Sequence, residues 1–211
     1  MQLLAMLTML VDHIGIVLFP EEPGWRYIGR LAMPLYAYAL VIGYRMTRSV
    51  PKYMLRLAVI AVVSQLPYQW ALIDPTTERP DVNVVGSLLV CLCILWLIDR
   101  LKHPAFGIPA VLAGCVLLEL LHFNYGAYIL LLVLIYRYTQ SHLAVALHFV
   151  LNLSFVYVGW FSQMFSIFAT MTLVYAPYAL KGIDRIRIPR IVWRTFYPVH
   201  LAALAAVRFL L

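Results

Sequence analysis

The chain has 211 residues, of which 64% are hydrophobic and only 12% are charged, with a formal net charge of +7 and a mean hydropathy of +0.88. Soluble domains carry roughly 45–50% apolar and about 25% charged residues, so this composition excludes a soluble globular protein. Long unbroken apolar runs replace the period-two alternation of a membrane β-barrel, and the sequence therefore predicts an all-α, polytopic bundle of membrane-spanning helices.

Charged residues, prolines and glycines divide the chain into apolar segments that we predict to be nine transmembrane helices. No linker or internal repeat separates them, so residues 1–211 are predicted to form a single domain. Several segments are shorter than the ~20 residues of a straight span, and at 122–124 a re-entrant hairpin is an alternative to two full spans. The predicted spans are 3–19, 28–44, 53–73, 84–98, 107–121, 125–138, 143–158, 161–180 and 195–211.

The charged residues between these spans alternate in sign along the chain. Acidic residues dominate one set of loops, which holds Glu21, Glu22, Asp74, Glu78 and Asp81 with only Arg26 and Arg79 among them. The positive-inside rule places the other set in the cytoplasm, with the N-terminus inside and the C-terminus outside. Basic residues spread over short loops predict a lipid bilayer, and no nucleic acid, as the partner. They are Arg45, Arg48, Lys52, Arg100, Lys102, Arg137, Lys181, Arg185, Arg187, Arg190 and Arg194.

The basic segment 181–194 reads KGIDRIRIPRIVWR and alternates isoleucines with charged residues. This pattern fits a short interfacial helix that lies against anionic lipid. It fits a plain charged cytoplasmic loop equally well, and the sequence leaves both interpretations open.

Polar side chains inside the predicted spans are the candidates for function, because an Asp, Lys or Arg at a helix centre costs about 2.5–3.5 kcal/mol. At ~1.5 Å of rise per residue, Asp12 and His13 lie about 14–15 Å from the cytoplasmic face and His200 lies about 8 Å from it. We expect a polar path from the cytoplasm to mid-membrane. The set comprises Asp12, His13, Arg30, Arg45, Arg56, Gln65, Gln69, Glu119, His148, Asn152 and His200.

Asp12 and His13 are neighbours in sequence, so their side chains diverge by roughly 100° on a helix and cannot form a direct Asp–His pair. We predict that Asp12 pairs instead with an arginine of the second or third span, such as Arg30, which leaves His13 free to act on a substrate. The alternative is structural, with Asp12 in an ion pair that holds helices together and His13 in a polar helix contact.

Several common sites are absent from the sequence. The histidines are scattered, without the spacing of metal ligands beside a carboxylate, and we expect no metal. Cys91, Cys93 and Cys115 lie inside apolar runs and predict neither a disulfide framework nor a metal pair. Phosphate-binding and dinucleotide-binding glycine motifs and the Gly-x-Ser-x-Gly nucleophile motif are also missing.

Short polar motifs recur along most of the chain in an order that resembles the TraX family of bacterial membrane proteins. The resemblance is densest in the first third and thin between residues 84 and 118. The motifs are Asp-His-Ile-Gly at 12–15, Gly-Arg-x-x-x-Pro at 29–34, Thr-Arg at 47–48, Tyr-x-x-Arg at 53–56, Ser-Gln-x-Pro at 64–67, Glu119 followed by Asn-Tyr-Gly at 124–126, and Phe-Tyr-Pro-Val-His at 196–200.

This resemblance implies an acetyltransferase, because the member that gives the family its name acetylates the N-terminus of conjugative pilin. The family also resembles transmembrane acyltransferases, which pass an acyl group from cytoplasmic acetyl-CoA to an acceptor by way of a membrane-embedded histidine. The implied location is the bacterial inner (cytoplasmic) membrane. The implied acceptor is an amine or hydroxyl on a pilin-like peptide or on a glycan.

Within that function we assign roles to individual residues. Histidine suits the general base because its unperturbed pKa of about 6.5 lies near the operating pH, and we favour His13 over His200, with Asp12 fixing the local geometry. Arginine suits phosphate through paired hydrogen bonds, so the phosphates of acetyl-CoA are assigned to Arg45, Arg48 and Arg56. The acceptor site is assigned to Arg30, Gln65, Glu119 and Tyr125.

Two functions from other classes remain as alternatives. The first is a small transporter or channel that uses Asp12, Glu119 and Arg30 as a relay, although the inverted repeats of transporters are not visible in the sequence. The second is a non-catalytic membrane subunit of a pilus or secretion apparatus. The sequence leaves open the oligomeric state and the formation of an acetyl-histidine intermediate.

Overall fold

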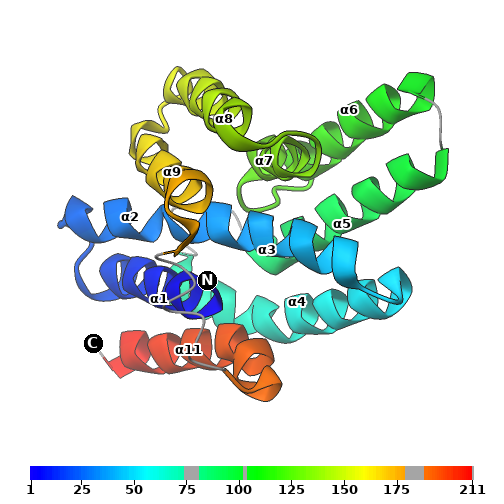
Figure 1. Ribbon diagram of the computed structural model, residues 1–211. Coiled ribbons are helices and arrows are strands. Elements are labelled where there is room, and N and C mark those ends of the chain that lie inside the picture. Colours follow the sequence, from blue (N-terminus) through cyan, green and yellow to red (C-terminus); the bar gives the residue numbers. More distant parts are fainter. Residues whose placement is uncertain (74–80, 102–103, 179–187, 211) are drawn as a thin grey trace.

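The computed structural model describes residues 1–73, 81–101, 104–178 and 188–210, and every regular element in these ranges is a helix (Figure 1). The predicted all-α class is therefore confirmed. The elements are α1 (Gln2–Leu18), α2 (Pro23–Gly29), α3 (Ala32–Met46), α4 (Val50–Leu72), α5 (Val84–Leu101), α6 (Pro104–Leu120), α7 (Gly126–Tyr138), α8 (Ser141–Val156), the 3-10 helix η1 (Phe161–Ser166), α9 (Ile167–Tyr175) and α11 (Arg190–Leu210).

Each predicted span contains a helix, but three of the predicted spans differ from the helices in the structure. The second span, 28–44, is divided between α2 and α3, because Pro34 has no N–H to donate to the carbonyl of Arg30. The eighth span, 161–180, begins as a 3-10 helix. The last helix begins at Arg190 and not near residue 195.

Some predicted features lie outside the described residues. Residues 181–187 of the proposed interfacial segment 181–194 are among them. The last residues of that segment, from Arg190 onward, form the first turns of α11. The loop charges Asp74, Glu78, Arg79, Lys102, Lys181, Arg185 and Arg187 also lie outside.

Helix α3 occupies the centre of the bundle and contacts α1, α5, α7 and α9. Helices α1, α4 and α11 lie on one side of it in Figure 1, where α4 packs along α11. Helices α5 to α9 continue in chain order on the other side, each packed against the next, and α2 packs against α1. The first and last helices of the chain, α1 and α11, are therefore neighbours.

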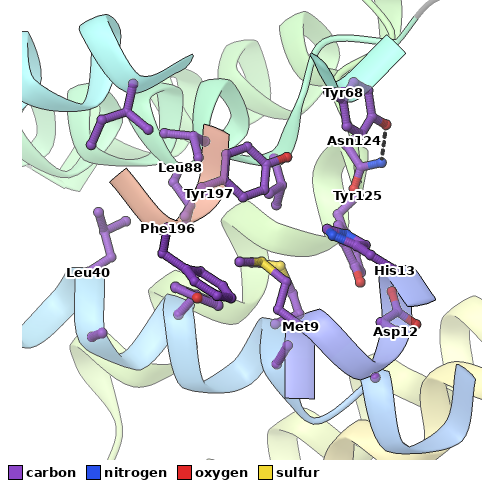
Figure 2. Close-up of a pocket in the computed structure, with 18 of the residues that line it drawn as sticks. Met9, Asp12, His13, Leu40, Tyr68, Leu88, Asn124, Tyr125, Phe196 and Tyr197 are labelled. Carbon is purple, nitrogen blue, oxygen red and sulfur yellow. Dashed lines mark hydrogen bonds between the residues drawn. The ribbon is translucent and has the colours of Figure 1, made fainter. Parts of the chain in front are cut away.

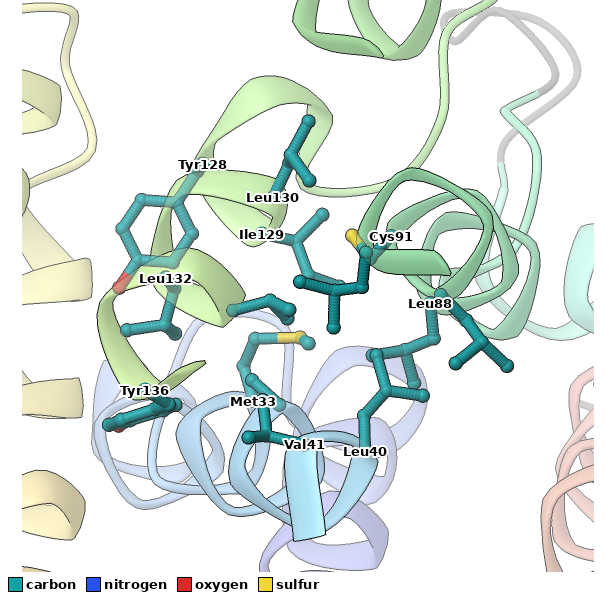
Figure 3. Packing of buried hydrophobic residues seen from close by; sticks show 14 of the residues in the cluster. Met33, Leu40, Val41, Leu88, Cys91, Tyr128, Ile129, Leu130, Leu132 and Tyr136 are labelled. Atoms are coloured by element: carbon teal, nitrogen blue, oxygen red, sulfur yellow. The ribbon is translucent and has the colours of Figure 1, made fainter. Parts of the chain in front are cut away.

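The main hydrophobic core lies between α3, α5 and α7 (Figure 3). Val41 of α3 contributes to it, as do Leu92 of α5 and Ile129 of α7, and the side chains of all three are fully buried. A smaller cluster joins α1, α4 and α11 through Met9, Ala71 and Leu201. Helix α1 contacts both α3 and α11, and the space described below lies among these helices and α4.

The outer faces of several helices are strongly apolar. By length and composition, Val50–Leu72 and Val84–Leu101 could each cross a membrane, and the other apolar helices are shorter. Contiguous apolar surface of this kind marks a face that binds lipid or another protein. On α4, α6 and α8 it is formed by Leu55, Val59, Val62, Val63, Leu66, Trp70, Phe106, Ile108, Leu112, Val116, Leu117, Leu120, Leu143, Leu147, Phe149, Val150 and Leu153.

Candidate active site

A cavity of about 1500 Å³ lies among α1, α3, α4 and α11. Figure 2 shows Met9 and His13 of α1 lining it opposite Tyr197 of α11. The cavity collects residues from both ends of the chain. Of the residues assigned from sequence, the cavity is lined by Asp12, His13, Arg30, Arg48, Arg56 and Tyr125, and it is not lined by Arg45, Gln65, Glu119 or His200.

The two candidate histidines form a direct pair. His13 Nδ1 lies 2.8 Å from His200 Nε2, and both side chains are buried. Their rings are within 5° of parallel with centroids 5.0 Å apart, which is the geometry of an edge-to-edge hydrogen bond between imidazoles. His13 faces the cavity, and His200 lies behind it and contacts the carbonyl oxygen of Phe196 through Nδ1 at 2.7 Å.

The sequence had placed these two histidines at different depths, and this expectation was wrong. It counted residues from a helix start near 195, whereas α11 starts at Arg190. Ten residues of helix place His200 about 15 Å from that start, and His13 lies about 16 Å along α1. The two histidines are therefore level in neighbouring helices.

Asp12 pairs with Arg26, and the expected pairing with Arg30 is not formed. The Arg26 guanidinium donates to Asp12 Oδ1 at 2.9 Å. The sequence had assigned Arg26 to a loop, but α2 begins at Pro23 and turns this arginine towards α1. As expected from the helix period, Asp12 and His13 point to different partners.

Arg30 joins the cavity to a second polar cluster. Its Nη1 donates to the hydroxyl of Tyr125 at 3.3 Å and to Gln163 Oε1 at 3.5 Å. Gln163 donates in turn to the hydroxyl of Tyr128 at 3.0 Å. Arg30 thus binds α2, α7 and η1 together beside the cavity.

One end of the cavity carries four exposed arginines. Arg48 and Arg56 come from the α3–α4 connection and α4, and Arg190 and Arg194 come from the first turns of α11. None of the four forms an ion pair within the described ranges. Arg45 differs, because its Nη2 donates to the carbonyl of Arg137 at 2.7 Å.

The family model described as TraX protein matches residues 1–208. The chain belongs to the TraX family. It is also 24% identical over 240 aligned positions to a probable fimbrial assembly protein FimC, serogroup H1, of Dichelobacter nodosus, an alignment that covers 100% of this chain and 95% of that protein. No solved structure matches the chain significantly.

Glycines in two of the TraX motifs lie where α1 and α2 approach each other closely. A Cβ atom on Gly29 would lie 2.1 Å from Asp12 Oδ1, and one on Gly15 would lie 2.3 Å from the Cβ of Trp25. Neither position has room for a larger residue. The glycines of Asp-His-Ile-Gly and Gly-Arg-x-x-x-Pro therefore allow the contact that seats Asp12 beside Arg26.

Two polar residues of the TraX motifs do not line the cavity and hydrogen-bond to backbone groups of nearby connections. Gln65 donates to the carbonyl of Asp81 at 2.8 Å and accepts from Asn83 Nδ2 at 2.7 Å. Glu119 accepts from the backbone N–H of Ala127 at 2.7 Å, at the first turn of α7. The Gln65 and Glu119 side chains thus stabilise the connections that precede α5 and α7. Their contacts give neither of them a position from which to bind the substrate that accepts the acetyl group.

A buried network around His148 was not recognised in the sequence as a unit. His148 and Asn152 were noted there only as polar residues inside a span. In the structure, the hydroxyl of Tyr128 contacts His148 Nε2 at 2.9 Å and donates to Asn152 Oδ1 at 2.8 Å. His148 Nδ1 contacts Thr170, and Ser166 completes the cluster. Hydrogen-bonded polar cores of this kind fix a unique packing of helices, here α7, α8 and α9.

Proposed function

We propose that this TraX-family protein is an integral membrane acyltransferase of the bacterial cytoplasmic membrane. It transfers an acetyl group from cytoplasmic acetyl-CoA to an amine or hydroxyl of an acceptor peptide or glycan. The observation that carries this proposal is a cavity that is lined by a buried histidine, His13, and by four arginines that have no acidic partner among the described residues. The similarity to a fimbrial assembly protein favours a pilus component as the acceptor.

Membrane insertion is supported by the apolar outer faces of α4, α6 and α8 and by the two helices that are long enough to span a bilayer. In this arrangement the arginine-lined end of the cavity faces the cytoplasm, where the positive-inside rule places basic residues. Acetyl-CoA is available on that side.

We expect labelling of single cysteines to confirm this topology. In a variant in which Cys91, Cys93 and Cys115 are replaced by serine, a Glu21→Cys substitution should react with a membrane-impermeant maleimide added to intact spheroplasts. A Lys52→Cys substitution should react only after the membrane is permeabilised, because basic loops remain in the cytoplasm. Labelling of Lys52→Cys in intact spheroplasts would contradict the proposed orientation.

The donor site follows from the charges at the cytoplasmic end. Coenzyme A carries several phosphate charges, and arginine binds phosphate through two parallel hydrogen bonds. Arg48, Arg56, Arg190 and Arg194 line one cavity from two chain segments, so they can contact one phosphorylated nucleotide together. The thioester end then extends towards His13.

The chemistry at His13 is a direct acyl transfer. The acceptor N or O attacks the thioester carbonyl carbon, a C–N or C–O bond forms, and the C–S bond breaks with coenzyme A thiolate as the leaving group. The proton of the acceptor passes to His13 and then to the thiolate sulfur. Histidine as general base contributes about 10²–10⁴-fold in rate in such steps.

Tyr197 is the candidate donor to the carbonyl oxygen. Its ring centroid lies 6.5 Å from that of His13, and its buried hydroxyl has no acceptor for its own hydrogen in the described parts of the chain. Buried polar groups nearly always have a partner, so a hydroxyl at the cavity wall with no protein acceptor favours an acceptor on the substrate. A donor at this place would stabilise the oxyanion that forms during attack.

Replacement of Tyr197 by phenylalanine should lower kcat by about 10²-fold, the effect of losing one oxyanion donor. The KM for acetyl-CoA should change little, because the lost hydrogen bond is strongest in the transition state. Thermal stability should change little, since the hydroxyl donates no hydrogen bond to the described residues that the substitution would break. Initial rates with radiolabelled acetyl-CoA provide the measurement, and an unchanged kcat would rule out this role.

The proposal as a whole is tested with purified protein in nanodiscs incubated with acetyl-CoA labelled in the acetyl group. We expect release of free coenzyme A and, when membrane extract or pilin peptide is added, transfer of label to the acceptor. Binding of coenzyme A without any turnover would exclude the enzyme and favour a transporter or a non-catalytic assembly subunit.

A further inference from the structure

The hydrogen bonds of the histidine pair determine which nitrogen atoms carry protons. His200 Nδ1 lies 2.7 Å from the carbonyl oxygen of Phe196. A carbonyl oxygen only accepts hydrogen bonds, so Nδ1 of His200 must carry a hydrogen. A neutral imidazole has one N–H, and Nε2 of His200 is therefore a bare acceptor.

The same reasoning extends to His13. Its Nδ1 lies 2.8 Å from the bare Nε2 of His200, so Nδ1 of His13 must donate. The hydrogen of the neutral His13 ring is then on Nδ1, and the lone pair is on Nε2. His13 lines the cavity, and its Nε2 has no hydrogen-bond partner among the residues that the structure describes.

The local sequence of α11 enforces this arrangement. Phe196 and His200 are four residues apart, so the Phe196 carbonyl lies next to the His200 side chain on the helix. The Phe196 ring also stacks on the His200 ring, with centroids 4.5 Å apart. One residue thus supplies the acceptor for His200 and fixes the plane of its imidazole.

We infer that the two histidines have different roles in the proposed acyl transfer, with Nε2 of His13 as the base that faces the reacting groups and His200 as a positioning residue that never touches the substrate. This division rests on the proposed function. The acceptor's proton goes to Nε2 of His13, whose Nδ1–H bond to His200 then becomes charge-assisted and stronger. The proton leaves again to the thiolate of coenzyme A.

The direct test is the protonation state of the two rings, which needs no substrate. Protein labelled with ¹⁵N-histidine is reconstituted in nanodiscs, and the His13 and His200 signals are assigned by their loss in His13→Gln and His200→Gln. We expect a protonated Nδ1 and a bare Nε2 on both rings. An Nε2–H form of His13 in the wild-type protein would overturn the inference.

The second arm measures turnover in two variants of His200. His200→Ala removes the acceptor that holds His13 in its tautomer, and turnover should fall by about 10²-fold or more, since a misplaced histidine tautomer can cost still more in other enzymes. In His200→Gln the side-chain amide oxygen can accept from Nδ1 of His13, so at least tenfold of that loss should be recovered. The KM for acetyl-CoA should stay the same in both variants.

These results separate the possible explanations. Exposed His142, which contacts Tyr175 away from the cavity, provides the control variant His142→Gln. Turnover of folded His200→Ala within twofold of wild type, or equal losses in His200→Ala and His200→Gln at unchanged thermal stability, would overturn the positioning role. Wild-type protein that shows the expected protonation states of both rings but no turnover would refute the proposed function and the base role of His13. Only the assignment of protons to ring nitrogens would then stand.

Discussion

Replacement of His13 by alanine or glutamine should reduce acetyl transfer by about 10²–10⁴-fold, the usual contribution of a general base. His13 is the only member of the histidine pair that lines the cavity, and among the described residues no second imidazole is in position to take the acceptor's proton. Binding of coenzyme A should persist, because the substitution leaves unchanged the four arginines that we assign to its phosphates. Initial rates with radiolabelled acetyl-CoA and equilibrium binding of coenzyme A measure the two quantities separately.

Glutamine is the more informative substitution for His13. Its amide can still donate to Nε2 of His200, so the contact between α1 and α11 is preserved while the base is lost. Alanine leaves a buried acceptor unpaired, at a cost of about 1–3 kcal/mol in stability. If His13→Gln, folded and able to bind coenzyme A, retained more than a tenth of wild-type turnover, the histidine-base mechanism would be wrong.

The donor arginines should control the KM for acetyl-CoA. We expect Arg56→Ala or Arg194→Ala alone to raise it about tenfold, and the double variant to raise it about 100-fold, because the two contribute independent charge-assisted hydrogen bonds. The kcat should change much less, since phosphate binding is remote from the acyl carbon and similar in the ground and transition states. Exposed charges are screened by salt, so the wild-type KM should also rise with ionic strength, and less so in the double variant.

Two further arginines sharpen this test. Arg100 is exposed near the end of α5, outside the cavity, and its guanidinium lies 4.8 Å from the Trp96 ring centroid, so Arg100→Ala serves as the control for loss of one surface charge. The sequence assigned Arg45 to the phosphates of acetyl-CoA, but in the structure its side chain donates a hydrogen bond to the Arg137 carbonyl. Arg45→Ala should therefore raise the KM less than Arg56→Ala. Equal effects of Arg56→Ala and Arg100→Ala would refute a specific donor site.

The arginines also illustrate what sequence patterns leave undecided. The positive-inside rule explains basic residues at 45–56 and at 190–194 equally well without any ligand. Arg190 and Arg194 are spaced to share one face of a helix, but nothing in the sequence places that face opposite Arg48 and Arg56. Their convergence depends on the packing of α11 against α4.

The partner of Asp12 shows the same limit at shorter range. The sequence correctly required an arginine and correctly kept Asp12 and His13 apart, because both statements follow from desolvation and from the helix period. It selected Arg30, since Arg26 lay in a predicted loop. The choice depends on where α2 begins, and helix ends are set by caps and prolines more than by hydrophobicity.

By itself, the sequence determined the helical class and singled out Asp12, His13 and His200 as polar residues inside apolar segments. Apolar runs specify helices because backbone groups in an apolar environment must be satisfied within their own segment, and costly polar residues stand out against such a background. The tertiary structure alone decided that His13 meets His200 across 187 positions of sequence, and that His200 lies behind His13. Contacts between distant helices depend on side-chain packing and on small shifts of helix ends, and neither is encoded in local periodicity.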